Sequence, residues 1–187
     1  EEVSNEQLFR FFRSIPDMSR ENVGSRLSVA GAQSKIGLAH MPGSPMSQGW
    51  LKPRGLAAST HILKTGSIEK LVSLEFLCMR AAKKCGVKVP EVTLLDFGKP
   101  VLAVERFDRV VTIDEEGLRV ERIHQEDFAQ AFGMTSASKY VELPNGSIAS
   151  IAQWIRSYAA KPTEDLSQFA KAVCFNYLIG NCDAHLK

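Results

Sequence analysis

The stretch Thr60-His61-Ile62-Leu63-Lys64 decides the fold that this sequence predicts. Its β-branched and aliphatic residues favour a short strand that ends in a lysine. A lysine at a strand end is usually solvated, and this is one interpretation of Lys64. The other interpretation is a cation held on a sheet beside bound phosphate, which needs a nearby carboxylate to orient it.

The segment after this strand predicts a helix over residues 68–85. Apolar residues recur there at helical spacing, and Gly86 follows as a stop signal. Glu75 falls on the apolar stripe, where an unpaired carboxylate would cost free energy. It either reaches solvent at the edge of the stripe or meets a cation, and Lys64 is the nearest suitable cation in the sequence. We therefore expect an ion pair between Lys64 and Glu75.

Further strands are predicted on both sides of this pair. Residues 26–39 hold two β-prone runs with small residues between them, which is typical of a hairpin with an amide-rich tip. Such a tip would let backbone N–H groups approach phosphate, although an ordinary small-residue hairpin has the same pattern. Residues 92–96 and 101–107 predict two more strands. The order of hairpin, lysine strand, glutamate helix and two strands is that of a protein-kinase small lobe.

The chain closes on Gly180-Asn181-Cys182-Asp183-Ala184-His185-Leu186-Lys187. Because the apolar periodicity before it ends near Gly180, Asp183 is predicted on a short loop. Asn181 and Asp183 either cap a turn or carry chemistry. Kinase catalytic loops use an acid to accept the substrate hydroxyl proton, with a metal-binding Asn five positions later, and here that Asn would fall one residue beyond Lys187. A thiol enzyme with Cys182 as nucleophile and His185 as base is a further alternative.

Three helices are predicted after residue 122, and a hairpin turn is predicted at residues 114–117. The helices cover residues 125–132, 147–160 and 163–179, the last with Thr163 as its N-cap. The helix at 147–160 is expected to turn Ile148, Ile151, Trp154 and Ile155 inward, so Trp154 is interpreted as a core residue. A short amphipathic helix is predicted over residues 5–13.

Composition bounds the class of protein. The chain has 187 residues, 44% of them hydrophobic and 24% charged, which suits one globular domain or a two-lobed one. A formal net charge of +2 gives no argument for direct nucleic-acid binding or for a membrane surface. The four cysteines form no C-x-x-C pair and the histidines are scattered, so we expect reduced thiols and no metal-binding residues in this chain. We expect a cytoplasmic protein.

Six stretches, in order along the chain, resemble the HipA-like serine/threonine kinase family, the toxin kinases of bacterial toxin–antitoxin modules. The stretches are Ser28-Val29-Ala30-Gly31-Ala32-Gln33-Ser34-Lys35, Thr60 to Lys64, Val87 to Pro90, Ala103-Val104-Glu105-Arg106-Phe107-Asp108-Arg109, Gln125 to Gln130, and Asn181 to Lys187. Six matches in the family's order are more specific than any one of them alone.

The resemblance implies an α+β, two-lobed, protein-kinase-like fold. Residues 1–107 would form a small nucleotide-binding lobe with an antiparallel sheet plus a helix, and residues 108–187 the first part of a helical large lobe that ends in the catalytic loop. The family's metal-binding Asn and Asp, the ligands of Mg²⁺, would lie beyond Lys187, and its additional N-terminal domain is absent. We therefore expect a fragment of a longer chain, inactive by itself.

The resemblance also implies roles for individual residues. Asp183 would be the catalytic base, Ser28 a regulatory autophosphorylated serine, and Glu75 the ion-pair partner of the phosphate-binding Lys64. The residues implied to bind ATP are Ala30, Gly31, Ala32, Gln33, Ser34 and Lys35 in the phosphate loop, Lys64, the hinge residues Glu105, Arg106 and Phe107, and His185 and Lys187 near the nucleotide.

The implied activity is transfer of the ATP γ-phosphate to a protein serine or threonine, with Mg²⁺ as a cofactor. Aminoacyl-tRNA synthetases are the implied substrate class, and a DNA-binding antitoxin is the implied partner. The alternative is a catalytically degenerate kinase-fold module that binds nucleotide or an antitoxin and performs no chemistry.

Overall fold

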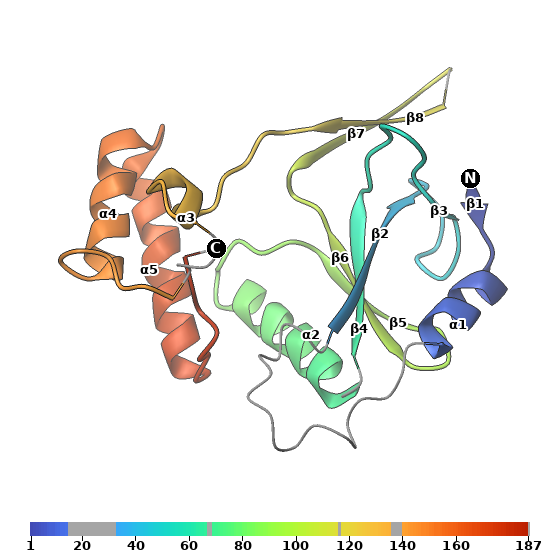
Figure 1. Ribbon diagram of the computed structural model, residues 1–187, viewed down its shortest axis with the longest axis horizontal. Helices are drawn as coiled ribbons and strands as arrows, with labels where there is room; N and C mark the ends of the chain where they lie inside the picture. Colours follow the sequence, from blue (N-terminus) through green and yellow to red (C-terminus); the bar gives the residue numbers. More distant parts are fainter. Residues whose placement is uncertain (15–32, 67–68, 116, 136–139, 187) are drawn as a thin grey trace. The chain divides into compact units, whose positions relative to one another are not determined.

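One antiparallel sheet and one separate two-stranded hairpin form the β-structure of the described residues, which are 1–14, 33–66, 69–115, 117–135 and 140–186 in this computed structural model. The elements, shown in Figure 1, are β1 (Glu2–Val3), α1 (Asn5–Arg13), β2 (Gln33–His40), β3 (Trp50–Leu51), β4 (His61–Gly66), α2 (Glu69–Lys84), β5 (Val92–Asp96), β6 (Pro100–Glu105), β7 (Arg109–Asp114), β8 (Gly117–Arg122), α3 (Phe128–Ala131), α4 (Ser147–Tyr158) and α5 (Pro162–Leu178).

The sheet has the strand order β1-β3-β2-β4-β6-β5, and every neighbouring pair is antiparallel. The strands predicted at residues 92–96 and 101–107 are present as β5 and β6, which pair with Leu94 opposite Leu102. Gly98 forms the turn between these strands with φ +78°, and its N–H donates to Asp96 Oδ1 at 2.9 Å. Of the hairpin predicted at residues 26–39, the described part is β2, which pairs with both β3 and β4.

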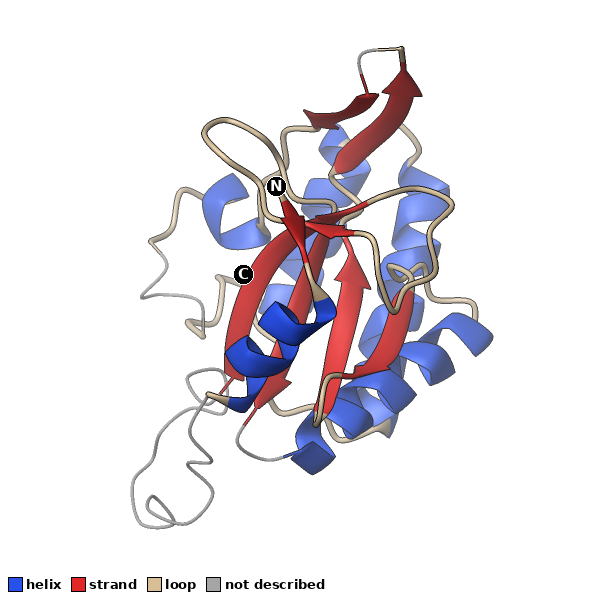
Figure 2. Ribbon diagram, turned by 90° about the vertical axis from the view of Figure 1, so that its right-hand side faces the viewer, coloured by secondary structure: helices blue, strands red, loops and turns tan. Residues whose placement is uncertain are grey.

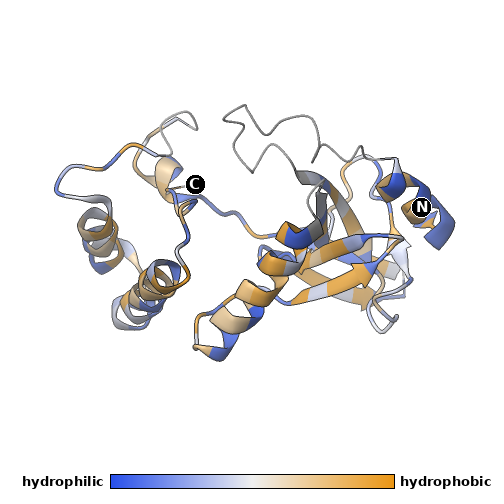
Figure 3. Cartoon of the chain, turned by 90° about the horizontal axis from the view of Figure 1, so that it is seen from below, coloured by the Kyte–Doolittle hydropathy of each residue, from blue (hydrophilic) through white to orange (hydrophobic). Residues whose placement is uncertain are grey.

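The sheet is covered by a helix on each face. Figure 1 shows α1 and α2 on opposite sides of the strands, and Figure 2 shows α1, next to the N-terminus, in front of them. Along β6 the side chains alternate: Val101 and Ala103 join the core cluster that contains Leu8 and Phe12 of α1, whereas Leu102 joins the cluster that contains Val72 of α2. Apolar residues accordingly dominate the strands and α2 in Figure 3.

Helix α1 begins at a capping box. The Ser4 hydroxyl accepts from the N–H of Gln7 at 3.2 Å, and Gln7 Oε1 accepts from the N–H of Ser4 at 2.8 Å. Leu8, Phe11 and Phe12 were expected to pack inward; Leu8 and Phe12 are buried, but the prediction is wrong for Phe11, which is 40% exposed.

The hairpin of β7 and β8 turns where the sequence predicted, with Asp114 opposite Gly117. Gly117 has φ +115°, a conformation that favours glycine. Its strands pair with each other and are distinct from the six-stranded sheet.

The helices after residue 123 pack around a third apolar cluster. Its buried members are Ala129, Leu143, Ile151, Ile155 and Leu186, and Trp154 packs against them, so the interpretation of Trp154 as a core residue is confirmed.

Three details of these helices were predicted wrongly. Thr163 is not the N-cap of α5, because the helix starts one residue earlier at Pro162, a residue suited to a first helical position. Helix α3 starts at Phe128, because the Asp127 carboxylate accepts from the N–H of Gln130 and caps the helix there. Ile148 is 59% exposed and lies in the first turn of α4.

The chain divides into two compact units. The first unit comprises residues 1–80 and 90–123, and the second comprises residues 81–89 and 124–187. Within the second unit, Gln168 of α5 accepts from the N–H of Lys88 at 2.9 Å and donates to the carbonyl oxygen of Gly86 at 3.3 Å. The fold is therefore mixed α+β, with an antiparallel sheet in the first unit and mainly helices in the second. The sequence predicted a nucleotide-binding lobe at residues 1–107 and a large lobe from residue 108. This division by function stays a prediction.

A buried aromatic cluster closes one end of the sheet. The rings of His40, Trp50 and His61 contact one another with centroid distances of 4.7 to 5.7 Å. His61 Nδ1 lies 2.8 Å from the Thr60 hydroxyl, and His40 Nε2 lies within hydrogen-bond distance of the carbonyl oxygens of Pro45 and Gln48. Burial, together with the nearby His40, lowers the pKa of His61 from 6.5 to about 4.

We expect the protein to lose stability as the pH falls through the range between these two pKa values, 6.5 and about 4. The unfolded chain takes up a proton on His61 within this range and the folded chain does not, so stability rises with pH there. The measurement is the melting temperature at about pH 7.5 and about pH 5. The difference between the two temperatures should be smaller in His61→Phe than in the parent protein. His124→Gln, at a side chain that is 86% exposed, should leave the difference unchanged. Equal pH dependence in the parent and in His61→Phe would contradict the prediction.

Candidate functional site

Lys64 and Glu75 form an ion pair on the face of the sheet that α2 covers. Alternation along β4 buries Leu63 and Thr65 and places Lys64 opposite Leu102, whose side chain contacts α2. Lys64 Nζ lies 2.6 Å from Glu75 Oε1, and the two side chains are 21% and 29% exposed. The ion pair predicted from the apolar stripe is therefore confirmed.

Lys35 lies beside this ion pair on the neighbouring strand. The register of β2 and β4 places Lys35 directly opposite Lys64, so both side chains leave the sheet on the same face. Like charges in directly opposite positions are destabilising. Two neighbouring lysines on one face, one of them paired with a carboxylate, suit a phosphate-bearing ligand.

Of the other residues in and just before the predicted phosphate loop, the structure describes only Gln33 and Ser34. Ser34 lies opposite Thr65, one position from Lys35 and so on the other face of the sheet. Gln33 begins β2 opposite Gly66. Ser28, Ala30, Gly31 and Ala32 lie outside the described residues.

The predicted hinge, Glu105 to Phe107, begins at the last residue of β6. The N–H of Glu105 donates to the carbonyl oxygen of Glu91 at 2.9 Å, and the N–H of Arg106 donates to that of Thr60 at 2.8 Å. These two donors are thus committed to other backbone groups of the protein. Phe107 lies in a turn and its side chain is 72% exposed.

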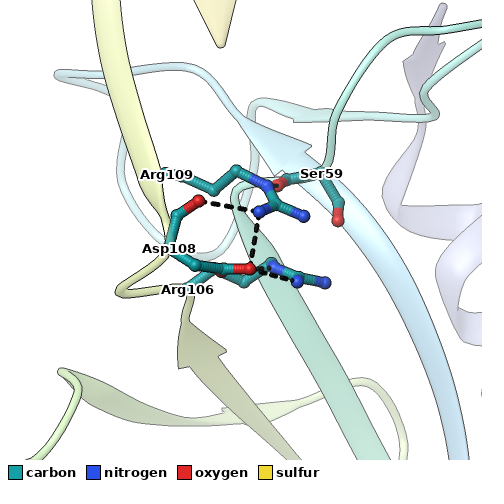
Figure 4. A network of polar contacts seen from close by, with 4 residues as sticks. All are labelled: Ser59, Arg106, Asp108 and Arg109. Atoms are coloured by element: carbon teal, nitrogen blue, oxygen red, sulfur yellow. Dashed lines mark hydrogen bonds and ion pairs between the residues drawn. The ribbon is translucent and has the colours of Figure 1, made fainter. Parts of the chain in front are cut away.

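An acid that the sequence analysis did not assign to the site anchors this hinge. Asp108 binds the guanidinium groups of both Arg106 and Arg109, as Figure 4 shows. The signal in the sequence that could have indicated this cluster is the alternation of acids and arginines in residues 105–109, at the end of a buried strand.

In the second unit, Asp183 lies on a turn after α5. Gly180 adopts φ +64° and ends the helix, and the N–H of Asp183 donates to Asn181 Oδ1 at 3.0 Å. The hydroxyl of Tyr140 donates to Asp183 Oδ1 at 2.6 Å. The turn therefore holds the backbone of Asp183, and Tyr140, a residue that the sequence analysis left without a role, holds its carboxylate.

The other residues of the terminal loop have different surroundings. The ring of His185 lies edge-on to that of Tyr140, with centroids 5.3 Å apart, and Leu186 is buried in the apolar cluster. Cys182 is exposed, and its thiol lies 3.4 Å from the Gly180 carbonyl oxygen. A cavity of about 690 Å³ adjoins the loop, with lining residues that include Tyr140, Val173, Asn181 and His185. Lys187 lies outside the described residues.

Neither metal ligands nor membrane spans emerge from the described part of the chain. No three of its described His, Cys, Asp and Glu residues gather closely enough to hold a metal ion. None of its described helices is long and apolar enough to cross a membrane.

We expect the Lys64–Glu75 pair to be energetically coupled. Each single variant, Lys64→Met or Glu75→Gln, removes one charge of the pair and leaves the other charge partly buried without it. The double variant removes both charges. A double-mutant cycle by chemical denaturation should give a coupling of about 1 to 2 kcal/mol.

The control is the exposed pair Lys161 and Glu164, with side chains 69% and 59% exposed. Its cycle should give about 0.5 kcal/mol or less. If the coupling free energy of Lys64 and Glu75 is no larger than that of this control pair, the prediction is wrong.

Comparison with known proteins identifies relatives across most of the chain. The sequence profile of the HipA-like C-terminal domain matches residues 27–187. The Y4mE protein of Sinorhizobium fredii is 37% identical over 171 residues, which are 88% of this chain and 38% of that protein. The serine/threonine-protein kinase toxin HipA of Shewanella oneidensis is 36% identical over 177 residues, 87% of this chain and 38% of the toxin.

A solved structure has the same fold. It is the Shewanella oneidensis complex of the toxin–antitoxin system HipA, HipB and its operator DNA, and one of its chains superposes with a TM-score of 0.77 at 32% identity. The match covers 100% of this chain and 45% of that chain. The chain thus spans about two fifths of the length of the curated relatives it matches, which are covered to 38%. On the match to residues 27–187, the chain belongs to the HipA-like C-terminal domain family.

Proposed function

We propose that the full-length protein containing this chain is a cytoplasmic, ATP-dependent serine/threonine protein kinase of the HipA toxin type. The observation that carries the proposal is the Lys64–Glu75 ion pair beside Lys35 on one face of the sheet. A lysine on a sheet strand, oriented by a glutamate from a helix, is how kinases hold the ATP phosphates. Membership of the family and the likeness to the HipA structure support the same activity.

In this proposal the first unit is the nucleotide-binding part of the small lobe. Lys64 and Lys35 contact the phosphates, and Glu75 keeps Lys64 extended toward them. The segment Ala30 to Lys35, whose last three residues begin β2, adds backbone N–H groups to the phosphate site. The adenine is held by the hinge Glu105 to Phe107, and because the N–H groups of Glu105 and Arg106 are already committed, the N–H of Phe107 is the donor assigned to it.

Asp183 is the catalytic base of the proposed reaction. A substrate serine or threonine hydroxyl gives its proton to Asp183 while its oxygen forms a bond to the γ-phosphorus of ATP. The bond from that phosphorus to the β,γ-bridging oxygen breaks, and ADP leaves. Tyr140 holds Oδ1, so Oδ2 is the oxygen assigned to the substrate hydroxyl. His185 and Lys187 lie near the nucleotide in this assignment.

Mg²⁺, when bound with ATP, neutralises charge on the phosphates. The described residues of this chain include no group of acids or histidines that fits it, so none of them is assigned to the metal.

The proposed protein partners follow from the relatives. The solved complex contains HipA with HipB and operator DNA, and we assign to the full-length protein an antitoxin that binds DNA. The proposed substrate class is the aminoacyl-tRNA synthetases.

Two alternatives remain open to experiment. A degenerate kinase-fold module would bind nucleotide or antitoxin without turnover. A thiol enzyme would use Cys182 and His185, and it would depend on the thiol rather than on Asp183.

We expect Asp183→Asn to lower the kinase rate of the full-length protein about 10³-fold, because the amide cannot accept the substrate proton. Phosphorylation is measured as transfer of labelled γ-phosphate to serine or threonine, either in the kinase itself or in an added protein. Cys182→Ser, at the neighbouring exposed residue, is the matched control and should retain near-parental activity.

The thiol enzyme would be favoured by the reverse pattern, in which Cys182→Ser loses activity and Asp183→Asn retains it. ATP binding without turnover in the parent protein would favour the degenerate module.

We also expect Ser28 to act as a switch. A phosphate on Ser28 would compete with the ATP phosphates for backbone N–H groups and for Lys64, so Ser28→Asp should bind ATP about tenfold more weakly than Ser28→Ala. Calorimetry on the full-length protein measures both affinities, and phosphopeptide mapping locates the modified residue. Equal affinities, or modification at another residue, would remove Ser28 from the mechanism.

A further inference from the structure

A cluster of one acid and two arginines joins two segments of the first unit, residues 106–109 and residues 59–60. Asp108 Oδ1 accepts from Arg106 Nε at 3.0 Å, and Asp108 Oδ2 accepts from Arg106 Nη2 at 2.7 Å. Arg109 Nη1 donates to the backbone carbonyl oxygen of Asp108 at 2.7 Å and forms an ion pair with Oδ2 at 2.7 Å. The side chains of Asp108, Arg109 and Arg106 are 7%, 8% and 24% exposed. Both carboxylate oxygens are therefore engaged by guanidinium groups (Figure 4).

The cluster reaches the residues just before β4. Arg109 Nε donates to the carbonyl oxygen of Ser59 at 3.0 Å, and the backbone N–H of Arg106 donates to the carbonyl oxygen of Thr60 at 2.8 Å. A side chain built on Gly37 of β2 would meet the Ser59 hydroxyl at 3.0 Å, so Ser59 also packs closely against β2. The hinge is thus tied to the segment that leads into β4, the strand of Lys64.

Charge keeps this cluster intact at neutral pH. The hydrogen bond from Arg106 is the largest cause that lowers the pKa of Asp108 to about 2, and Arg109 adds to it. The carboxylate is therefore ionised whenever the protein is folded at neutral pH. Removing it would leave two guanidinium groups without their anion in a poorly hydrated place.

We propose that Asp108 is the positioning residue of the nucleotide hinge. It fixes Arg106 on one side of Phe107 and Arg109 on the other, and so it holds the backbone of Phe107 between two anchored residues. Asp108 is not a catalytic residue, because both its oxygens are occupied within the protein. This inference rests on the proposed function, in which the backbone of Phe107 contacts the adenine.

The test compares ATP binding and kinetics in the full-length parent and in Asp108→Asn. The variant keeps the shape of the side chain and loses the charge that anchors both arginines, so the Kd for ATP should rise about tenfold. The KM for ATP should rise in parallel, while kcat at saturating ATP should stay within about twofold, because Lys64 and Asp183 are untouched. Asp96→Asn, which removes an exposed carboxylate elsewhere in the same unit, should leave all three quantities unchanged.

A second variant keeps the inference testable if Asp108→Asn does not fold. Arg109→Lys retains the positive charge but cannot bridge Asp108 and Ser59 as the guanidinium does, and it should raise the Kd for ATP about threefold. A lowered melting temperature with parental ATP affinity in either folded variant would overturn the inference and show a purely structural cluster. A parent protein that does not bind ATP would overturn the proposed kinase and this inference together, whereas binding that ignores both substitutions would overturn this inference alone.

Discussion

The first unit depends on an interior strand of its sheet that is buried on both faces. Strand β6 sends Val101 and Ala103 to one side and Leu102 to the other, and each side is covered by a different helix. Because the side-chain period of a strand is two, this arrangement also decides where the neighbouring strands send their polar residues. Lys64, opposite Leu102, has to emerge on the face of α2, and a shift of one residue in register would have buried it against α1.

Local pattern predicted the parts of the molecule that depend on neighbours in sequence. The strands around Lys64, helix α2, the hairpin turn near Gly117 and the core position of Trp154 all follow from periodicity and turn chemistry. The Lys64–Glu75 pair spans 11 positions, but a carboxylate on an apolar stripe demands a cation and few were in reach. Errors concentrated at the starts of helices, where the Asp127 cap sets the start of α3 and Pro162 that of α5.

The polar contacts that the sequence did not reveal join residues that are far apart in the chain. Arg109 and Ser59 are separated by 50 positions, and Tyr140 and Asp183 by 43. Nothing in local spacing distinguishes these residues from solvated ones, since an arginine or a tyrosine fits an exposed turn equally well. The pairings exist because the sheet and the helical cluster bring distant backbone segments together, and the sequence pattern alone carries no record of such distances. The residues of a proposed site can thus be predicted from local pattern. The distant residues that hold them in place are found only from the three-dimensional structure.

The discontinuity of the second unit has a consequence for dissecting the molecule. Residues 90–123 of the first unit are inserted between the two parts of the second, and the division passes through α2 after Arg80. No single cut of the polypeptide can release either unit whole. During synthesis, Gly86 and Lys88 leave the ribosome long before Gln168, so the strands β5 to β8 emerge before the second unit can close. Autonomous versions of the two units would therefore need a redesigned connectivity, with residues 81–89 joined directly to residue 124.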